Sequence, residues 1–385
     1  MQATPQSPNP NSRPQQAFTL IELLVSMTVL SLMMVMVFSM VTSTQKTWNV
    51  ARSRVSQFRE ARAAFEAVTQ DLRQATLNTY FDYDYGNGRY RSINTTNPTT
   101  PQRYQRQSEL HFISGPTKKL IDGANNIDAS RLPGHAAFFQ IPGGFGVKEE
   151  NSQFKDLLNA RGYFVEYGED TEFKPDFLRR ETKPRYRFRL MELRPPTETL
   201  IIYQRNLKAG GTGREEDPKG GIGASKNALR QWFTSQLGDE FIGGSVKRPI
   251  ADNIIAAFFL PKLPERSTDD LVLAPDYVYD SRLWQHGNPN SEIAKYTKNL
   301  VPPLIEVTMV AVDEKSMIRY QQQNPDSKES MPDFVSDTLF TKYNNYRSFQ
   351  DDLEALKAAL DSKKIAHRVF SQTIPLRASG WSQEP

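Results

Sequence analysis

The sequence predicts an α+β protein in which one long N-terminal helix, transmembrane at first and amphipathic afterwards, packs on an antiparallel β-sheet head with loop insertions. Three observations lead to this fold class. Residues 23–41 form a run of 19 residues without a charge. Neither glycine nor proline occurs between Phe18 and Thr79. After Tyr80 the sequence changes to short strand-like runs separated by polar segments.

The composition describes a polar chain. Its 385 residues are enough for a sizeable core and a second module, and 48 Lys+Arg against 44 Asp+Glu give a net charge of +4. The mean hydropathy of −0.59 is that of a soluble protein. Since there is no cysteine, disulfides, zinc–thiolate sites and thiol nucleophiles are excluded.

The uncharged run predicts a membrane-spanning helix over residues 18–41. Ten of its residues are Leu, Val or Phe, which at ~0.5 kcal/mol each favour insertion by roughly 5 kcal/mol. The run is longer than the apolar core of a secretory signal, and no small-x-small cleavage pattern follows it. Five methionines in the run would allow adaptable packing in a helix bundle: Met27, Met33, Met34, Met36 and Met40.

Residues 1–17 form a leader rich in Pro, Gln, Asn and Ser, with Arg13 as its one charge. A single acid, Glu22, then lies at the mouth of the apolar helix. A carboxylate costs ~2.5–3.5 kcal/mol at the bilayer centre, so its presence favours a functional role. The alternative is that Glu22 lies at the level of the lipid headgroups.

Residues 42–79 predict an amphipathic continuation of the helix. Nonpolar residues recur there at multiples of three to four positions, and charged residues occupy the other face. A coiled-coil stalk is disfavoured because the stripe is not a sustained heptad. The nonpolar stripe comprises Trp48, Ala51, Val55, Phe58, Phe65, Val68, Leu72 and Ala75.

Residues 80–385 predict the α+β head. Residues 81–88 are turn-like, and loops are expected at 205–223 and 262–300. The arginines of Arg185–Leu190 alternate with apolar residues, which predicts a half-solvated antiparallel strand. Strands are expected at Leu110–Ser114, Ala136–Ile141, Tyr163–Tyr167, Tyr186–Leu193, Thr199–Tyr203, Ile254–Leu260, Leu304–Val312 and Val369–Leu376. Helices are expected near Phe154–Arg161, Ala224–Leu237 and Asp351–Lys364, the last capped by Ser348.

Catalytic, metal and cofactor sites have little support, so no enzyme activity is expected. The glycines at 210–213 and 220–223 complete no phosphate-binding pattern. Asp82, Asp84 and Asn87 are spaced as in a calcium loop, but Ile93 stands where the loop needs Glu. No metal-binding or catalytic spacing links His111, His135, His286 and His367.

Nucleic-acid binding is also disfavoured. Residues 103–106 and 185–189 mix cations with aromatic residues, as single-strand binders do. Solvated strand faces explain the same pattern, and the near-neutral charge balance offers no large basic field.

The segment Ala17-Phe18-Thr19-Leu20-Ile21-Glu22-Leu23-Leu24-Val25 resembles the type IV prepilin and pseudopilin signature. The resemblance implies that a membrane aspartyl peptidase cuts between Ala17 and Phe18 and methylates the new amine of Phe18. The family usually has Gly where this chain has Ala17. In a bundle of such helices, Glu22 can neutralise the N-terminal amine of a neighbouring subunit.

The charge pattern and the resemblance disagree about orientation. Arg13 precedes the helix, whereas Lys46, Arg52, Arg54 and Arg59 follow it, so a positive-inside count places the head in the cytoplasm. The resemblance implies a cytoplasmic N-terminus and a periplasmic head. We favour this second orientation, because long domains translocate regardless of charge and the leader must face the peptidase.

Three further segments resemble the Verru_Chthon cassette protein C family of large prepilin-like proteins, which is similar in outline to the J-type minor pseudopilin of type II secretion. They are residues 248–255, 273–282 and 302–314.

The two resemblances together imply a minor pseudopilin or pilin-like subunit of a type II secretion or type IV pilus-like filament or tip complex. Its partners would be the prepilin peptidase/methyltransferase, other pilin-like subunits and, before assembly, the inner membrane. The alternative is a single-pass anchored periplasmic binding or enzymatic domain that does not assemble.

Overall fold

The structure, a computed structural model, consists of two compact units, Met1–Ser56 and Gln57–Pro385. The described residues are 19–84, 100–101, 103–121, 128–151, 156–200, 230, 232–237, 240–241, 244–264, 273–274, 276–282, 297–328, 330–334, 339–340 and 346–379.

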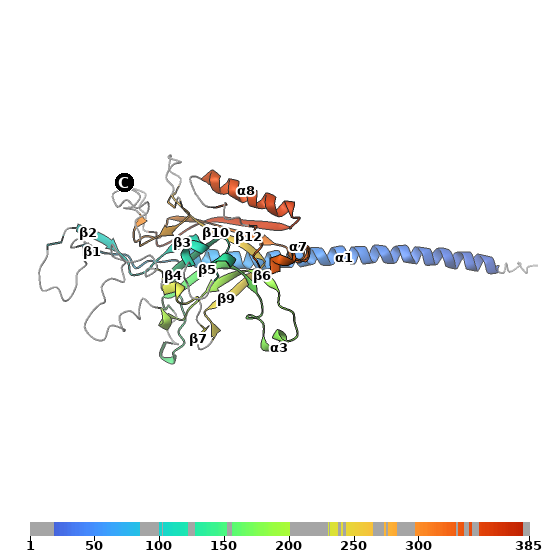
Figure 1. Cartoon of the computed structure of the whole chain (residues 1–385), viewed down its shortest axis with the longest axis horizontal. Coiled ribbons are helices and arrows are strands. Elements are labelled where there is room, and N and C mark those ends of the chain that lie inside the picture. Colours follow the sequence, from blue (N-terminus) through green and yellow to red (C-terminus); the bar gives the residue numbers. More distant parts are fainter. Residues whose placement is uncertain are drawn as a thin grey trace, which may run out of the picture. The chain divides into compact units, whose positions relative to one another are not determined.

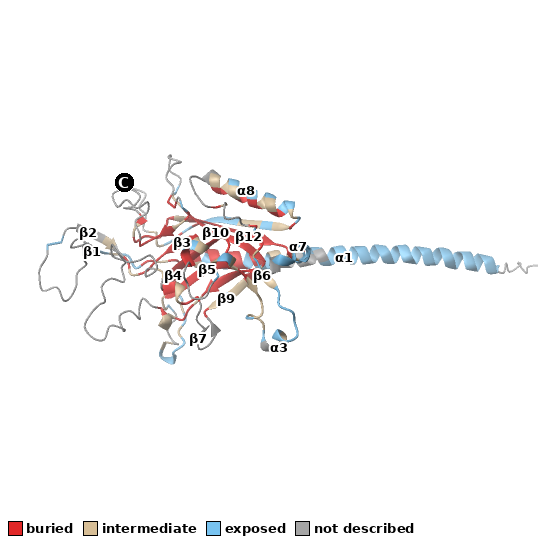
Figure 2. Cartoon of the chain, in the orientation of Figure 1, coloured by how far each residue is buried: buried red, intermediate tan, exposed pale blue. Residues whose placement is uncertain are grey.

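Helix α1 (Leu20–Arg73) begins in the first unit. Its segment Leu20–Asn49 is long and apolar enough to cross a membrane, and none of its apolar window is buried within the protein. Figure 2 shows this part of the helix as exposed throughout. A helix that exposes so many apolar side chains needs an apolar environment, which a bilayer or a bundle of similar helices supplies.

In the second unit α1 buries one face. Residues spaced three or four apart point into the core, and charged residues such as Arg62 and Glu66 lie outside. This pattern confirms the predicted amphipathic continuation. The buried apolar residues of α1 are Ala61, Ala64, Phe65, Val68 and Leu72.

The helix ends at Arg73, earlier than the predicted end at Thr79. The amides of Gln74 and Ala75 bond to carbonyls three residues back, which tightens the last turn. The amide of Thr76 then donates to the carbonyl oxygen of Gln140 at 2.9 Å. No glycine or proline marks this boundary. Instead, a hydrogen bond to a distant strand ends the helix.

The head contains an antiparallel sheet of six strands in the order β11-β3-β4-β5-β6-β9. Figure 1 labels β3, β4, β5, β6 and β9 of this sheet. Their bounds are β3 Ile113–Pro116, β4 His135–Ile141, β5 Asn159–Glu169, β6 Tyr186–Leu193, β9 Lys247–Asp252 and β11 Tyr279–Asp280.

A second antiparallel sheet has the order β10-β12-β13, with β10 at Ile254–Lys262, β12 at Leu304–Val312 and β13 at His367–Pro375. Two ribbons complete the described strands. They pair β1 (Tyr80–Asp84) with β2 (Arg103–Gln107), and β7 (Glu240–Phe241) with β8 (Gly244–Ser245).

Shorter helices cover or connect the strands. The α-helices are α2 Thr117–Ile121, α3 Asp176–Arg179, α7 Glu314–Gln323 and α8 Tyr346–Ser362. The 3₁₀-helices are η1 Ala129–Arg131, η2 Glu149–Asn151, η3 Thr197–Thr199 and η5 Pro325–Lys328.

The main core joins α1, one face of the six-stranded sheet, the three-stranded sheet and α8. Alternate residues of the strands divide between two clusters: Phe139 and Tyr163 belong to this core, whereas Phe138 and Phe164 belong to a second core on the opposite face. Because both faces of the six-stranded sheet are covered, its central strands are buried along nearly their whole length.

Most strand predictions are confirmed. β6 and β12 have the predicted bounds, and β4, β5, β10 and β13 overlap the predicted runs. The run Leu110–Ser114 is extended as a paired strand only from Ile113 onward.

The predicted helix near Phe154–Arg161 is wrong where the structure describes it, because Asn159–Arg161 begin β5. This strand pairs with β4 on one side and β6 on the other. Its first seven residues are buried, so tertiary pairing overrides the local helical spacing.

Other local predictions need correction. Tyr80–Asp84 form β1 instead of a turn, and Thr199 ends the 3₁₀-helix η3 instead of starting a strand. The predicted loop at 262–300 contains β11. Helix α8 begins at Tyr346, so Ser348 lies inside the helix and does not cap it. Residues 201–229, which include the predicted loop 205–223 and the first six residues of the helix predicted at 224–237, lie outside the described residues. Of the rest of that predicted helix, residues 230 and 232–234 are helical.

Candidate functional site

The candidate site is the start of α1. The predicted cleavage residues, Ala17 and Phe18, lie outside the described residues, which begin at Thr19. Thr19 and Glu22 are joined by a reciprocal set of hydrogen bonds. The amide and the hydroxyl of Thr19 donate to Glu22 Oε2 at 3.0 and 2.9 Å, and the amide of Glu22 donates to Thr19 Oγ1 at 3.4 Å.

This arrangement is a capping box, in which a threonine and a glutamate three residues later satisfy each other's amides at a helix start. The sequence signal, Thr-x-x-Glu before an apolar run, is present in the predicted motif. The negative carboxylate also lies at the positive end of the helix dipole. Glu22 therefore stabilises the first turn of its own helix even without a partner subunit.

The helix surface beyond Glu22 is apolar. Glu22 lies at one end of a shallow groove along α1, followed by Val25, Val29 and Met33. The neighbouring motif residues Leu20, Ile21 and Leu23 are 80%, 70% and 56% exposed. The hydroxyl groups of this segment donate hydrogen bonds to backbone carbonyls of the same helix.

Ser26 Oγ donates to the carbonyl of Leu23, and Thr28 Oγ1 to that of Val25, at 2.9 and 2.8 Å. Ser39 bonds in the same way to Met36. Such bonds leave no hydroxyl without a partner at these positions and suit an apolar surrounding. Glu22 is thus the charged group of an otherwise apolar surface.

In the head, a buried polar network holds α1 on the six-stranded sheet. Asp71 Oδ2 accepts from Arg161 Nε at 3.1 Å and from the Tyr163 hydroxyl at 2.7 Å. Glu192 lies 3.7 Å from Arg161 and 2.5 Å from Arg248. Burial, together with the charges of Asp71 and Glu192, raises the pKa of Tyr163, so its hydroxyl stays protonated as a donor.

The sequence analysis missed this network. Asp71 lies beside the apolar stripe of α1, next to Leu72, and that position is the signal that a charged residue faces the protein. Which strand residues meet it depends on the sheet pairing, which the sequence pattern does not supply.

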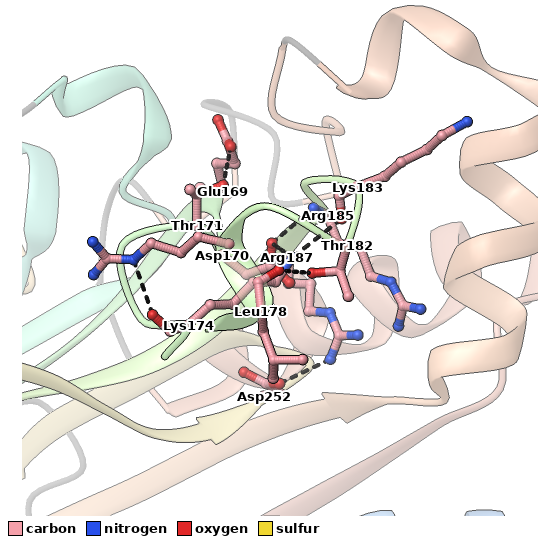
Figure 3. A network of polar contacts seen from close by, with 12 residues as sticks. Glu169, Asp170, Thr171, Lys174, Leu178, Thr182, Lys183, Arg185, Arg187 and Asp252 are labelled. Atoms are coloured by element: carbon pink, nitrogen blue, oxygen red, sulfur yellow. Dashed lines mark hydrogen bonds and ion pairs between the residues drawn. The ribbon is translucent and has the colours of Figure 1, made fainter. Parts of the chain in front are cut away.

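The β5–β6 connection is folded over the predicted arginine strand (Figure 3). Asp170 accepts hydrogen bonds from the Arg185 amide and from Lys174 Nζ, at 2.8 and 2.9 Å. Burial raises the pKa of Asp170, but these bonds outweigh it and hold the pKa below its usual range. Arg187 bonds to Asp252 at 2.9 Å.

Arg189 corrects the prediction of a half-solvated strand. Its side chain is 3% exposed, donates to the carbonyls of Glu169 and Gly168, and lies over the Phe173 ring at 5.0 Å. The strand is antiparallel as predicted. Its arginine face is covered at Arg189, where the connection between β5 and β6 folds back over it, whereas Arg185 is exposed as predicted.

Two of the described histidines, His111 and His135, are buried inside the head. His111 Nε2 lies 2.7 Å from Asp280 Oδ1, and Trp232 Nε1 donates to His111 Nδ1 at 2.9 Å. All three side chains are buried, and burial lowers the pKa of His111. Since the indole donates to Nδ1, the neutral ring carries its proton on Nε2 and donates to Asp280. The trio links the segment just before β3, strand β11 and the segment at 232–237.

The other three histidines are not part of this trio. His135 is buried against Phe258 and Tyr277 with ring-centroid distances of 5.1 and 5.0 Å. His367 is half-buried at the start of β13, and His286 lies outside the described residues.

Among the residues that the structure describes, no group of three or more His, Asp or Glu side chains is arranged to hold a metal ion. Asp82 and Asp84 are on β1, whereas Asn87, Ile93 and both glycine clusters lie outside the described residues. In the arginine-aromatic segment of β2, Tyr104 is exposed and stacks on Phe81 at 5.3 Å.

Comparison with known proteins finds a family match at the N-terminus. Residues 12–38 match the family described as the prokaryotic N-terminal methylation motif. The matched span contains the predicted cleavage residues, the capping box of Thr19 and Glu22, and most of the apolar segment. No curated protein and no solved structure matches the chain.

Proposed function

We propose that the chain is a minor pseudopilin or pilin-like subunit, because its N-terminus is type IV prepilin-like, of the kind that a prepilin peptidase processes. It is made as a precursor in the inner membrane and cut between Ala17 and Phe18. The new amine of Phe18 is methylated. The mature chain then joins other pilin-like subunits in a type II secretion or type IV pilus-like filament or tip complex.

The observation that carries this proposal is the position of Glu22, one charged group at the start of an exposed apolar helix. In water or lipid alone this carboxylate has the Thr19 amide and hydroxyl as its partners. In a bundle of such helices it meets the amine of a neighbouring Phe18, where the low dielectric strengthens the attraction. The pairing fixes the axial register between subunits.

The orientation follows from the processing step. The leader faces the cytoplasm, where the peptidase acts, and the head lies in the periplasm. The head contributes contacts with partners instead of catalysis. The resemblance of residues 248–255, 273–282 and 302–314 to a cassette protein family supports the minor role, since a large head suits low copy number.

The test is the N-terminus of the mature protein from its native host, determined by mass spectrometry. The proposal predicts a chain that begins with N-methylated Phe18. An intact Met1, or a cut after Val41, would overturn it and favour the single-pass anchored domain that does not assemble. A strain without the prepilin peptidase is the control and should retain residues 1–17.

A further inference from the structure

The edges of the two large sheets differ in how they are protected. β9 carries Pro249, the charges of Lys247 and Arg248, and a bulge opposite Leu190 and Met191. β11 is two residues long. β10 is buried from Ile254 to Pro261. Short strands, prolines, charges and bulges are the means by which proteins block unwanted strand pairing.

β13 has none of these protections in its middle. It is nine residues long, pairs with β12 without an irregularity, and exposes the small polar run Ser371–Thr373. Its one proline, Pro375, is the last residue. A long, regular and exposed edge strand is a template for another strand.

The hydrogen-bond pattern shows which amides are open. The amide of Leu376 donates to Pro303, and the amide of Asp313 to Ala366, so the even-numbered residues of β13 bond to β12. The amides of Val369, Ser371 and Thr373 therefore point away from β12. No partner for them occurs among the described residues.

A polar groove of about 1010 Å³ runs beside this edge, within the second unit. Arg62, Glu66 and Arg73 of α1 line one side, and Gln372 and Arg377 line the other. Arg62 is paired with Glu66 at 2.9 Å. Arg73 and Arg377 have no carboxylate partner among the described residues, so the groove has a surplus of positive charge.

We propose that the open edge of β13 and this groove bind an extended acidic segment of a different protein by β-strand addition. Backbone hydrogen bonds to Val369, Ser371 and Thr373 would supply the pairing, and Arg73 and Arg377 would select acidic side chains. A second copy of this chain fits poorly, because β13 has a basic residue, Arg368, and no acid. Pairing two copies would bring like charges together.

This proposal does not depend on the assembly proposed above, because the site uses neither the leader nor Glu22. The probe is a fluorescent heptapeptide, Thr-Val-Glu-Val-Glu-Val-Thr, measured by anisotropy with the full-length protein in detergent micelles. We expect saturable binding, and binding at least about tenfold weaker for the same peptide with Lys in place of Glu. No saturable binding of the acidic peptide, or equal binding of both peptides, would overturn the proposal.

A double variant and its control test whether the charges of Arg73 and Arg377 contribute to binding. R73E/R377E should weaken binding of the acidic peptide by about tenfold and strengthen binding of the lysine peptide. The matched control R180E/K183E makes the same change in net charge at two exposed cations of the β5–β6 connection and should leave both affinities unchanged. If the two double variants behave alike, the groove is not the site.

Thr373→Pro tests the edge, since it removes an outward amide but no bond to β12. Binding should be lost while the circular dichroism spectrum is kept. If this variant does not fold, a peptide with alternate N-methylated amides tests the same ladder on the wild-type protein. Undiminished binding of that peptide would show that no strand is added.

Discussion

Glu22 has two successive partners under the proposed function. In the single chain its carboxylate accepts from Thr19, and in an assembly it would pair with the amine of a neighbouring Phe18. The capping bonds orient the carboxylate at the helix start before any neighbour arrives. These are the solvent-exposed bonds of a helix cap, so a neighbouring ammonium group can displace them.

We predict that Glu22→Ala leaves cleavage largely intact but prevents incorporation, because the helix keeps its apolar surface and loses its charged partner. Mass spectrometry reports cleavage, and copurification with partner pilins reports incorporation. Ser26→Ala, on the same face of α1, is the control and should assemble normally. Unchanged copurification of the Glu22 variant would contradict the charge pairing.

Tyr163 tests the network that holds α1 on the sheet. We predict that Tyr163→Phe lowers the free energy of unfolding by about 1–2 kcal/mol, because Asp71 loses a donor at 2.7 Å in a buried site. Thermal unfolding of the full-length protein in micelles, followed by circular dichroism, measures the loss. Tyr186→Phe is the control, because its hydroxyl has no hydrogen bond to any residue that the structure describes. Equal losses in the two variants would contradict the role of Asp71.

His135 makes the free energy of unfolding depend on pH. Neither ring nitrogen has a partner among the described residues, and burial lowers the pKa to about 3. Between about pH 6.5, where an unfolded histidine titrates, and about pH 3, the unfolded chain binds a proton that the folded chain excludes. Stability is therefore complete above this window and falls as the pH falls through it.

We predict that His135→Leu removes this contribution. The difference in free energy of unfolding between variant and wild type should be constant above about pH 6.5 and should grow in favour of the variant toward pH 3. Denaturant unfolding at a series of pH values measures it. Parallel stability curves across the whole range would show that His135 does not titrate as inferred.

At the scale of elements, Gly134 sets the approach of two sheets. It precedes β4 with φ of +71°, and a Cβ there would lie 2.9 Å from the carbonyl oxygen of Ala257 in β10. Gly143 has φ of +87° but nothing within 4 Å of its Cβ position. Both glycines tolerate a left-handed backbone, and only the first also faces another backbone.

This contrast gives a matched pair of variants. Gly143→Ala should cost about 1 kcal/mol through backbone strain alone, whereas Gly134→Ala should cost clearly more, because the β10 backbone must move as well. Denaturant unfolding of the two full-length variants measures the difference. Equal costs would mean that the contact between β4 and β10 relaxes freely.

Elements with a strong pattern of their own were predictable. The alternation of β6 and the apolar run of β12 gave their bounds, and the spacing of Phe65, Val68 and Leu72 gave the buried face of α1. Elements decided by distant partners were not. The end of α1 depends on a bond from Thr76 to Gln140, and β5 begins where β4 and β6 offer hydrogen bonds.

The same division holds for the candidate site. Thr19 and Glu22 lie within one turn of helix, so the sequence motif contained the whole arrangement. The groove beside β13 combines α1 with the last strand of the chain. The two groove arginines that we propose to select acidic side chains, Arg73 and Arg377, are more than 300 positions apart in sequence, and no local pattern relates them.

At the scale of the whole molecule, orientation is the property on which the proposed function depends. Lys46 and the arginines after it favour a cytoplasmic head by the positive-inside pattern, whereas processing requires a cytoplasmic leader. The absence of cysteine allows a direct measurement, since a single introduced thiol has no competitor. Lys183 is exposed in the head, and Ser12 belongs to the leader.

We predict that Lys183→Cys is labelled by a membrane-impermeant maleimide once the outer membrane is permeabilised, while the inner membrane is intact. Ser12→Cys, made in cells without the prepilin peptidase so that the leader is retained, should be labelled only after the inner membrane is lysed. A long domain can translocate against a local charge bias, which is why we expect this outcome. The reverse labelling would place the head in the cytoplasm and exclude assembly into a periplasmic filament.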